Sequence, residues 1–346
     1  MVCIGILSTG SYLPARVVGN DEIAGSAGVS AEWIVRKTGI AERRRAATHE
    51  ASSDLAATAA LRALDQAGLS PAQVDYVVVA TSTPDHPQPA TASIVQHLIG
   101  AESAGAFDMN AVCSGFVYAL MVTERLLRGD GGGGYGVVVG VDIYSRILDY
   151  SDRRTAALFG DGAGAVVLGP VSNGAGLADA LLMSRGDLHS LIQVPAGGSR
   201  LPASESTLEQ GRHFFTMDGR GVRDFVREQL PGAVRELLRR GRVRADEVRH
   251  FIPHQANGAM LADLVPTLGL TAAHTHLTVD RYGNTGAASI PITLDAAYRR
   301  GSIGPGDLVL LAGFGGGMSV GASLVRWTSA RQSPPVPAPA IAQSVA

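Results

Sequence analysis

Six short segments of nearly continuous apolar residues recur along the chain. They span residues 74–81, 136–142, 164–169, 249–254, 307–315 and 321–327. Runs of this kind, rich in Val, Ile and Leu without polar alternation, are typical of strands buried on both faces. Segments with helical periodicity lie among them, at 53–67, 115–128, 221–240 and 289–300. We therefore predict an α/β protein in which helices cover buried sheets.

The order of these elements occurs twice. The stretch LRALDQAGLSPAQVDYVVVAT ends a helix and begins a strand, and VRELLRRGRVRADEVRHFIPH does the same later in the chain. Likewise, GVVVGVD followed by GDGAGAVVLG matches DLVLLAGFGGG followed by GASLVRW. We predict two βαβ-type halves related by duplication, at 1–172 and 173–330, and a flexible Pro/Ala-rich tail at 331–346.

Composition excludes several classes of protein. The 346 residues are 46% hydrophobic and 17% charged, and the net charge is −2, so no broad basic surface for nucleic acid is expected. The sequence has neither a signal-peptide pattern nor an apolar run long enough to span a bilayer, so we expect no membrane partner. Its two cysteines, Cys3 and Cys113, exclude a disulfide framework and favour a cytoplasmic location.

Cys113 lies in FDMNAVCSGFVYAL, between an extended run and an apolar helix. At the first turn of a helix, unpaired N–H groups and the helix dipole favour a thiolate, the reactive form of cysteine. Cysteine is also among the most buried residue types, so simple packing is the alternative. Taken alone, this motif favours packing as the role of Cys113. No feature of the sequence around Cys3 indicates a role other than packing.

Three further motifs follow predicted strands or turns. His254, in FIPHQAN, comes directly after a buried strand, at the sheet edge where α/β proteins bind ligands, although a lone histidine is more often structural. Asn284, in YGNTGAAS, can donate its amide N–H into a pocket or merely cap a helix. The glycines of AGFGGGMS, 312–319, can present backbone N–H groups to an oxyanion or form a plain turn. Together these groups suit acyl transfer through a thioester.

With these motifs in place, the chain resembles the β-ketoacyl-acyl-carrier-protein synthase III family of thiolase-like condensing enzymes, from about residue 4 to 327. The matching segments are STGSYLP (8–14), EWIVRKTGI (32–40), VCSGF (112–116), FGDGAGAVVLG (159–169), PHQAN (253–257), YGNTGAASIP (282–291) and GFGGG (313–317). The cysteine box together with PHQAN and GNT is specific. The resemblance implies a homodimer with a thiolase-like αβαβα five-layered fold built from two duplicated halves.

The resemblance also implies a mechanism. Cys113 would be the acylated nucleophile of a Cys-His-Asn triad with His254 and Asn284. The backbone N–H groups of Cys113 and Gly316 would form the oxyanion hole, and Phe314 would lie beside the cysteine. An acyl-CoA primer would acylate Cys113. A malonyl thioester, on acyl carrier protein or CoA, would then lose carbon dioxide and attack the acyl group to give a 3-oxoacyl product. Donors that meet charge where it develops suit this chemistry.

The same resemblance assigns groups to the CoA substrate, and it implies neither a metal nor a bound cofactor. Trp33 and Arg153 match positions that sandwich the adenine, a role for which a Trp and Arg pair is well suited. Their alternatives are core packing for Trp33 and a solvated loop charge for Arg153. Asn257, the last residue of PHQAN, is placed in the same substrate-binding set.

Some positions depart from the family pattern around the primer site. Gln88 stands where an aromatic gate usually reaches across the dimer into the primer pocket, and a polar amide there changes the accepted acyl chain or needs a polar partner. Tyr144 and Phe215 are bulky where aliphatic residues are common. We predict that they narrow the primer site or contact a non-fatty acyl group.

Other departures weaken the docking of an acidic carrier protein. Asp224, Ala259 and Pro266 stand at positions that are usually basic, which lowers electrostatic attraction. The helical stripe of Arg220, Arg223 and Arg227 offers either a shifted basic patch or an ordinary solvated face. These changes favour a specialised polyketide-type pathway slightly over fatty-acid initiation.

Two alternatives stay open at this stage. A synthase III-like protein can transfer the acyl group to an alcohol or amine without decarboxylation, with His254 as general base. A catalytically silent subunit that only shapes a heterodimer is the other alternative, and the intact triad argues against it.

Overall fold

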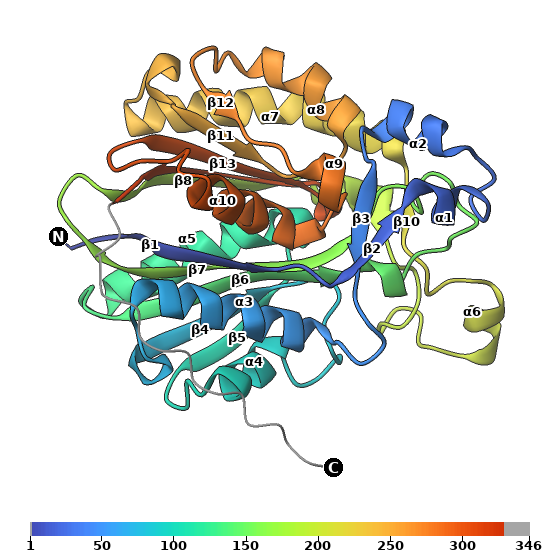
Figure 1. Ribbon diagram of the computed structural model, residues 1–346, viewed down its shortest axis with the longest axis horizontal. Coiled ribbons are helices and arrows are strands. Elements are labelled where there is room, and N and C mark those ends of the chain that lie inside the picture. The colour runs from blue at the N-terminus through green and yellow to red at the C-terminus, as the bar shows by residue number, and fades with distance from the viewer. Residues whose placement is uncertain (1, 329–346) are drawn as a thin grey trace.

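The computed structural model describes residues 2–328, and two five-stranded mixed sheets form its framework (Figure 1). The first sheet contains β1 (Cys3–Tyr12), β4 (Val74–Ala80), β5 (Gly105–Met109), β6 (Tyr135–Ile143) and β7 (Asp161–Val171), in the spatial order β1-β7-β6-β4-β5. Strand β4 is parallel to β5 and β6, whereas β7 is antiparallel to both β6 and β1.

The second sheet repeats this topology. It contains β8 (Gly176–Ser184), β11 (His250–Pro253), β12 (His274–Thr275), β13 (Leu308–Gly315) and β14 (Ser319–Arg326). Its spatial order, taken from β8, is β8-β14-β13-β11-β12, with two antiparallel pairings followed by two parallel ones. The two sheets therefore share one succession of strands, which confirms the predicted duplication. The limits 1–172 and 173–330, as boundaries of the halves, stay a prediction.

Helices on the outer faces of the sheets and between them complete a five-layered arrangement (Figure 1). Helices α3 (Ser52–Ala67) and α4 (Thr91–Ile99) cover the outer face of the first sheet, and α7 (Gly219–Gly241) and α8 (Gly258–Leu264) cover that of the second. Helices α5 (Gly115–Gly129) and α10 (Ser289–Arg299) lie between the sheets. This is the predicted αβαβα fold.

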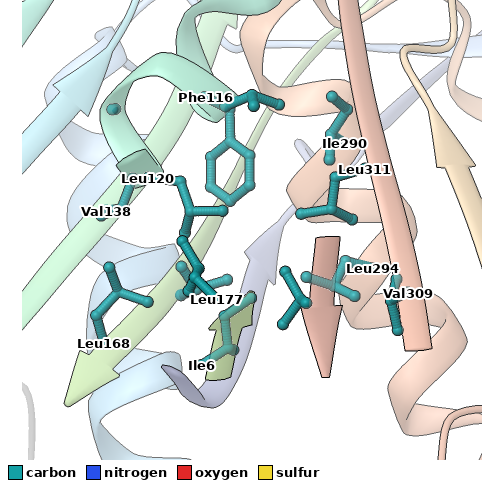
Figure 2. Close-up of a cluster of buried hydrophobic side chains, with 14 of the residues drawn as sticks. Ile6, Phe116, Leu120, Val138, Leu168, Leu177, Ile290, Leu294, Val309 and Leu311 are labelled. Atoms are coloured by element: carbon teal, nitrogen blue, oxygen red, sulfur yellow. The ribbon is translucent and has the colours of Figure 1, made fainter. Parts of the chain in front are cut away.

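The central helix pair is buried because its apolar residues face both sheets. Figure 2 shows Phe116 and Leu120 of α5, and Ile290 and Leu294 of α10, in one cluster with Leu311 of β13. Each of these side chains is almost completely buried. Burying a residue of this size contributes about 1.5–3 kcal/mol. The residues that begin these two helices are thereby fixed against the ends of the strands.

Shorter elements lie around the framework. The helices are α1 (Asn20–Ala24), α2 (Ala31–Thr38), α6 (Glu205–Glu209) and α9 (Val279–Tyr282), and the strands are β2 (Arg16–Gly19), β3 (Glu42–Arg45), β9 (Ile192–Gln193) and β10 (Thr216–Met217). The 3₁₀ turns are η1 (Pro71–Gln73), η2 (Val112–Ser114), η3 (Tyr144–Arg146), η4 (Gly186–Leu191), η5 (Ala245–Glu247), η6 (Val265–Leu268), η7 (Gly286–Ala288) and η8 (Gly316–Met318). Three of these turns, η2, η7 and η8, position the candidate site.

The six predicted strands and four predicted helices are all present, with ends that differ by a few residues. The predicted tail, 331–346, lies outside the described residues. Within residues 2–328, no helix is long and apolar enough to cross a membrane.

Candidate active site

Cys113, His254 and Asn284 come together at one cavity of about 470 Å³. Cys113 lies in η2, directly before α5, and His254 follows the end of β11. Asn284 lies between α9 and η7, just ahead of α10. The cavity therefore lies where the parallel strands end and the central helices begin, the usual position of ligand sites in α/β sheets.

The thiol of Cys113 is buried, with 6% of the residue exposed. Burial, and secondarily the charge of Asp142, raises the pKa of Cys113 to about 12. The nearby backbone N–H groups of Gly316 and of Cys113 itself lower the pKa, but by less. The expectation that the helix start favours a thiolate is therefore wrong, because desolvation of the thiol outweighs the effect of the N–H groups.

Glycines allow β13 to approach the sulfur. A Cβ atom on Gly315 would lie 3.0 Å from the Cys113 sulfur, and one on Gly316 would lie 2.9 Å from the Val112 side chain. Val112 itself has φ 46°, a left-handed conformation that β-branched residues rarely adopt. Strain of this kind persists only where the surrounding structure enforces it. The backbone on both sides of the thiol is thus closely constrained.

His254 presents a neutral imidazole to the cavity. Burial lowers the pKa of His254 to about 3, so the ring carries one proton at neutral pH. Its Nδ1 lies 2.7 Å from the Ser289 hydroxyl oxygen, which leaves Nε2 for a bound substrate. The ring of Phe314, which also lines the cavity, packs edge-to-face on the imidazole with centroids 5.4 Å apart.

Asn284 is held so that its amide nitrogen can serve as a donor. Its Oδ1 accepts the backbone N–H of Gly286 at 2.9 Å, which fixes which end of the amide carries the nitrogen. The Nδ2 group donates to the carbonyl of Ala256 at 3.5 Å. Because an amide nitrogen carries two hydrogens, one further donor is available for the cavity that Asn284 lines.

Aromatic rings close the cavity on one side. Phe159 and Phe215 both line it, and their centroids are 5.0 Å apart. Tyr144 is not among the lining residues. It stacks behind Phe159 at 4.3 Å, with its hydroxyl oxygen 2.9 Å from that of Ser82. The expectation that Tyr144 contacts the primer directly therefore does not match its position, because it packs behind the ring that does the lining. Phe159 itself was missed, although it begins the quoted FGDGAGAVVLG motif.

The exposed end of the cavity is basic. Trp33 and Arg153 both line it, with the guanidinium carbon 6.0 Å from the indole centroid. The other charged lining residues are Arg36, Lys37, Arg154, Arg223 and Asp263. Arg36 and Lys37 were not singled out in the sequence, although they lie in the quoted EWIVRKTGI. Cationic side chains of this kind suit the phosphates of a nucleotide substrate.

Asn257 lines the cavity but also has a clear structural role. Its Oδ1 accepts the N–H of Met260 and so caps α8, while its Nδ2 donates to the carbonyl of Lys37. These bonds tie α8 to α2. Both amide ends therefore take part in the fold, and the second hydrogen of Nδ2 is left as a donor for the cavity.

Of the remaining predicted positions, Ala259 lines this cavity, whereas Gln88, Asp224, Pro266 and Gly316 do not. Gln88 is exposed, and its predicted reach into the site of a second copy stays a prediction. Gly316 does not line the cavity, although its N–H reaches the Cys113 sulfur. Asp224, Ala259 and Pro266 are exposed on α7, α8 and η6. One acidic and two uncharged side chains therefore stand at the three positions for which the family resemblance implies basic residues.

A buried cysteine, a neutral imidazole and an amide donor at the junction of two duplicated sheets define a condensing enzyme of thiolase-like fold. The chain belongs to the 3-oxoacyl-[acyl-carrier-protein] synthase III family. The family model named for this enzyme matches residues 107–186, and the model of its C-terminal part matches residues 238–327. As a member of this family, the protein is an acyltransferase that condenses an acyl-CoA primer with a malonyl thioester, by decarboxylation, to a 3-oxoacyl thioester.

Individual relatives match nearly the whole chain. Acetoacetyl CoA synthase NphT7 of Streptomyces sp. (strain CL190) is 54% identical over 324 residues, which cover 93% of this chain and 98% of that protein. The β-ketoacyl-[acyl-carrier-protein] synthase III of Clostridioides difficile is 43% identical over 326 residues, covering 94% and 98%.

Solved structures agree with these matches. The synthase III, FabH, of Pseudomonas aeruginosa PAO1 has a TM-score of 0.86 at 38% identity, covering 94% of this chain and 99% of that one. The priming β-ketosynthase of the R1128 polyketide pathway has a TM-score of 0.87 at 30% identity, covering 94% and 97%.

Proposed function

We propose that this protein makes a short 3-oxoacyl-CoA by condensing an acetyl group on Cys113 with malonyl-CoA. The observation that carries the proposal is the meeting of Cys113, His254 and Asn284 in one cavity that is buried and aromatic at one end and basic at the other. The name of the 54% identical relative, an acetoacetyl CoA synthase, supports the same product class.

The first half-reaction is transfer of the acyl group to the enzyme. The Cys113 sulfur bonds to the acyl carbon of acetyl-CoA, the bond between that carbon and the CoA sulfur breaks, and the thiol proton ends on CoA. Backbone N–H groups of Cys113 and Gly316 meet the oxyanion that forms in between. Because burial holds Cys113 as a thiol, the proton leaves as the sulfur attacks and not beforehand.

The second half-reaction forms the carbon–carbon bond. The carboxylate of malonyl-CoA leaves as carbon dioxide, and its bonding electron pair becomes the enolate. His254 and Asn284 stabilise the negative charge that develops on the thioester oxygen. The enolate carbon bonds to the acyl carbon, and the bond to Cys113 breaks. The sulfur takes one proton from solvent, which restores the thiol. A thiol, an imidazole, an amide and backbone N–H groups serve every step, so the proposal includes neither a metal nor a bound cofactor.

The charge distribution supports malonyl-CoA, and not malonyl-carrier protein, as the substrate that supplies the malonyl group. The basic side chains of the site lie at the cavity itself, where Trp33 and Arg153 can hold the adenine. On the outer face, Asp224 is exposed and lies 4.0 Å from the guanidinium of Arg223, so it offsets that basic charge toward an acidic carrier. The helical stripe of arginines on α7 is the feature that would favour a carrier protein instead. Arg223 lines the cavity, and Arg227 is exposed on the same helix.

The aromatic end of the cavity supports a small primer. Phe159 and Phe215 pack edge-to-face, Tyr144 stacks on Phe159, and all three rings are buried. A long acyl chain would have to displace this closely packed group, which is costly in a dense interior. We therefore propose acetyl-CoA as the primer and a specialised pathway as the setting.

Two further parts of the proposal concern assembly and location. We propose a homodimer, since β5 ends the first sheet with an edge that none of the other described strands covers, and open edges invite pairing. We propose a reducing cytoplasm, because the reaction needs the free thiol of Cys113. Sedimentation at several concentrations tests the dimer.

The acceptor is tested by direct competition. The purified protein, with acetyl-CoA present, is given malonyl-CoA or malonyl-carrier protein, and kcat/KM for condensation is measured with each. We expect malonyl-CoA to be preferred. The matched variant Asp224→Arg should raise kcat/KM with the carrier and leave that with malonyl-CoA unchanged. A preference of the unaltered protein for the carrier would overturn the proposal.

A further inference from the structure

The hydroxyl group of Ser289 has a defined hydrogen-bonding role next to His254. Ser289 is the first residue of α10 and is 1% exposed. Its Oγ accepts the backbone N–H of Gln255 at 3.3 Å and lies 2.7 Å from Nδ1 of His254. A backbone N–H can only donate, so this first bond uses an acceptor site of the oxygen and leaves the hydroxyl proton free to be donated. Within the described part of the chain, Nδ1 of His254 is the acceptor in reach of that proton.

The position of the ring is fixed by bonds to the neighbouring backbone. The N–H of His254 donates to the carbonyl of Ala312 on β13 at 2.7 Å. The side chain of Gln255 accepts the N–H groups of Thr278 and Val279 at 2.9 and 3.1 Å, and donates to the carbonyl of Pro253 at 2.8 Å. The segment that carries His254 is therefore anchored on both sides, and the imidazole meets the Ser289 hydroxyl in one defined orientation.

The two neutral forms of His254 would act differently in the cavity. If Nδ1 accepts a hydrogen bond, the single ring proton resides on Nε2, and the ring donates to a substrate oxygen. If Nδ1 carries the proton, Nε2 offers a lone pair and the ring acts as a base. Decarboxylative condensation needs the donor, whereas acyl transfer to an alcohol or amine needs the base.

We propose that Ser289 is a positioning residue that donates its hydroxyl proton to Nδ1 of His254 and so holds the imidazole in the form whose Nε2–H points into the cavity. The proposal rests on the proposed function, whose condensation step it explains. It also separates the condensing reaction from transfer to an alcohol or amine, because a histidine held in this form cannot accept the proton of such a nucleophile.

Nitrogen NMR of the protein labelled in its histidines tests the tautomer directly. His254 is assigned by the disappearance of its signals in His254→Asn. We expect the protein to show His254 with a protonated Nε2 and an unprotonated Nδ1, and Ser289→Ala to show a mixture of the two forms. A protonated Nδ1 in the unaltered protein would overturn the proposal.

Kinetics of variants separate a positioning role from a structural one. With Ser289→Ala we expect kcat for condensation to fall on the order of 10- to 100-fold, the range found for hydrogen-bond partners that orient metal-bound histidines. The KM for malonyl-CoA and the rate of Cys113 acetylation should change little. Ser289→Thr keeps the hydroxyl and should restore most of kcat. Equal losses in acetylation and condensation, or full activity of Ser289→Ala, would overturn the proposal.

Thr293 provides the matched control. It lies one turn along α10, is fully buried, and bonds to the carbonyl of Ser289 and the hydroxyl of Thr278. Thr293→Val should therefore disturb the helix without changing the His254 tautomer or the ratio of the two rates. Each assay is run with malonyl-CoA and with malonyl-carrier protein. A preference for the carrier would refute malonyl-CoA as the acceptor, while the ratio of condensation to acetylation rates in Ser289→Ala would still test the role of Ser289. Should Ser289→Ala not fold, the NMR of the unaltered protein decides.

Discussion

The backbone N–H of Gly316 lies close enough to the sulfur of Cys113 to lower the pKa of the thiol. Gly316 belongs to η8, which connects two strands of the second sheet, whereas Cys113 belongs to η2, which follows the first sheet. The contact depends on small residues, since side chains at Gly315 or Gly316 would collide with Cys113 or Val112. The candidate site therefore exists only where the two halves meet.

Moving this N–H should impair acyl transfer. In Gly316→Ala the new Cβ would lie 2.9 Å from Val112 and push the backbone away from the sulfur. We expect acetylation of Cys113 by acetyl-CoA to slow by about 10²- to 10³-fold, the usual cost of one oxyanion-hole donor. Rapid mixing followed by intact-mass analysis measures the rate. Gly133→Ala, where a Cβ meets nothing within 4 Å, is the control, and equal rates in the two variants would contradict the assignment.

The thiol of the free protein should lack a reactive thiolate at neutral pH. Burial raises the pKa of Cys113 to about 12, so the thiolate fraction grows steadily as the pH rises. We expect alkylation of Cys113 by iodoacetamide to accelerate by nearly ten-fold per pH unit from about pH 6 to pH 9. A plateau with a midpoint near neutral pH would mean that the helix N-terminus outweighs burial after all.

Burial of His254 should make the fold less stable in acid. The pKa of His254 is about 3 in the folded protein, against about 6.5 for an unfolded chain. Below the higher value, the unfolded chain takes up a proton that the folded protein does not. This group's contribution to stability is therefore lost as the pH falls.

Comparison with His254→Asn isolates the effect from other titrating groups. Urea unfolding of both proteins between about pH 6 and pH 4 should show their stability difference changing by about 1.4 kcal/mol per pH unit, with the unaltered protein losing more. Parallel stability curves would show that His254 is not buried as a neutral ring.

The size of the primer should depend on Phe215. Phe215 is 6% exposed and lines the cavity next to Phe159. We expect Phe215→Ala to accept longer acyl-CoA primers, measured as acyl-enzyme formed from a chain-length series, because removal of the ring enlarges the cavity that Cys113 also lines. The neighbouring Phe214 is 40% exposed, so Phe214→Ala should keep the original chain-length profile. A shared change in both variants would indicate general loosening.

Much of the fold could be predicted because its inner elements are continuous in sequence. The strands and helices around β4, α5 and β13 carry uninterrupted apolar runs, which identify buried elements. Strands β1, β8 and β12 were not among the six predicted strands, and β5 was expected only as an extended run before Cys113. In β1 (CIGILSTGSY), Ser and Thr interrupt the apolar pattern, and buried Ser8 and Thr9 bond to the carbonyl of Ala63 and the carboxylate of Asp295. Partners so far away in sequence leave no local signal.

Some residues of the candidate site could likewise be predicted from the sequence, whereas others depend on tertiary packing. Motifs identified Cys113, His254 and Asn284, because each lies directly beside a recognisable element. The positions of Tyr144 and Ser289 depended on packing between segments far apart in sequence. The protonation state of Cys113 depended on burial, which a helix-start pattern does not report.

The central claim is that Cys113 carries the acyl group that malonyl-CoA then takes in a decarboxylating step. Intact-mass analysis of the protein after acetyl-CoA, and again after malonyl-CoA, tests it most directly. We predict one acetyl group on Cys113, lost on addition of malonyl-CoA together with release of carbon dioxide and a 3-oxoacyl-CoA, and no adduct in Cys113→Ala. An adduct that persists in Cys113→Ala, or one that malonyl-CoA leaves in place, would contradict the account.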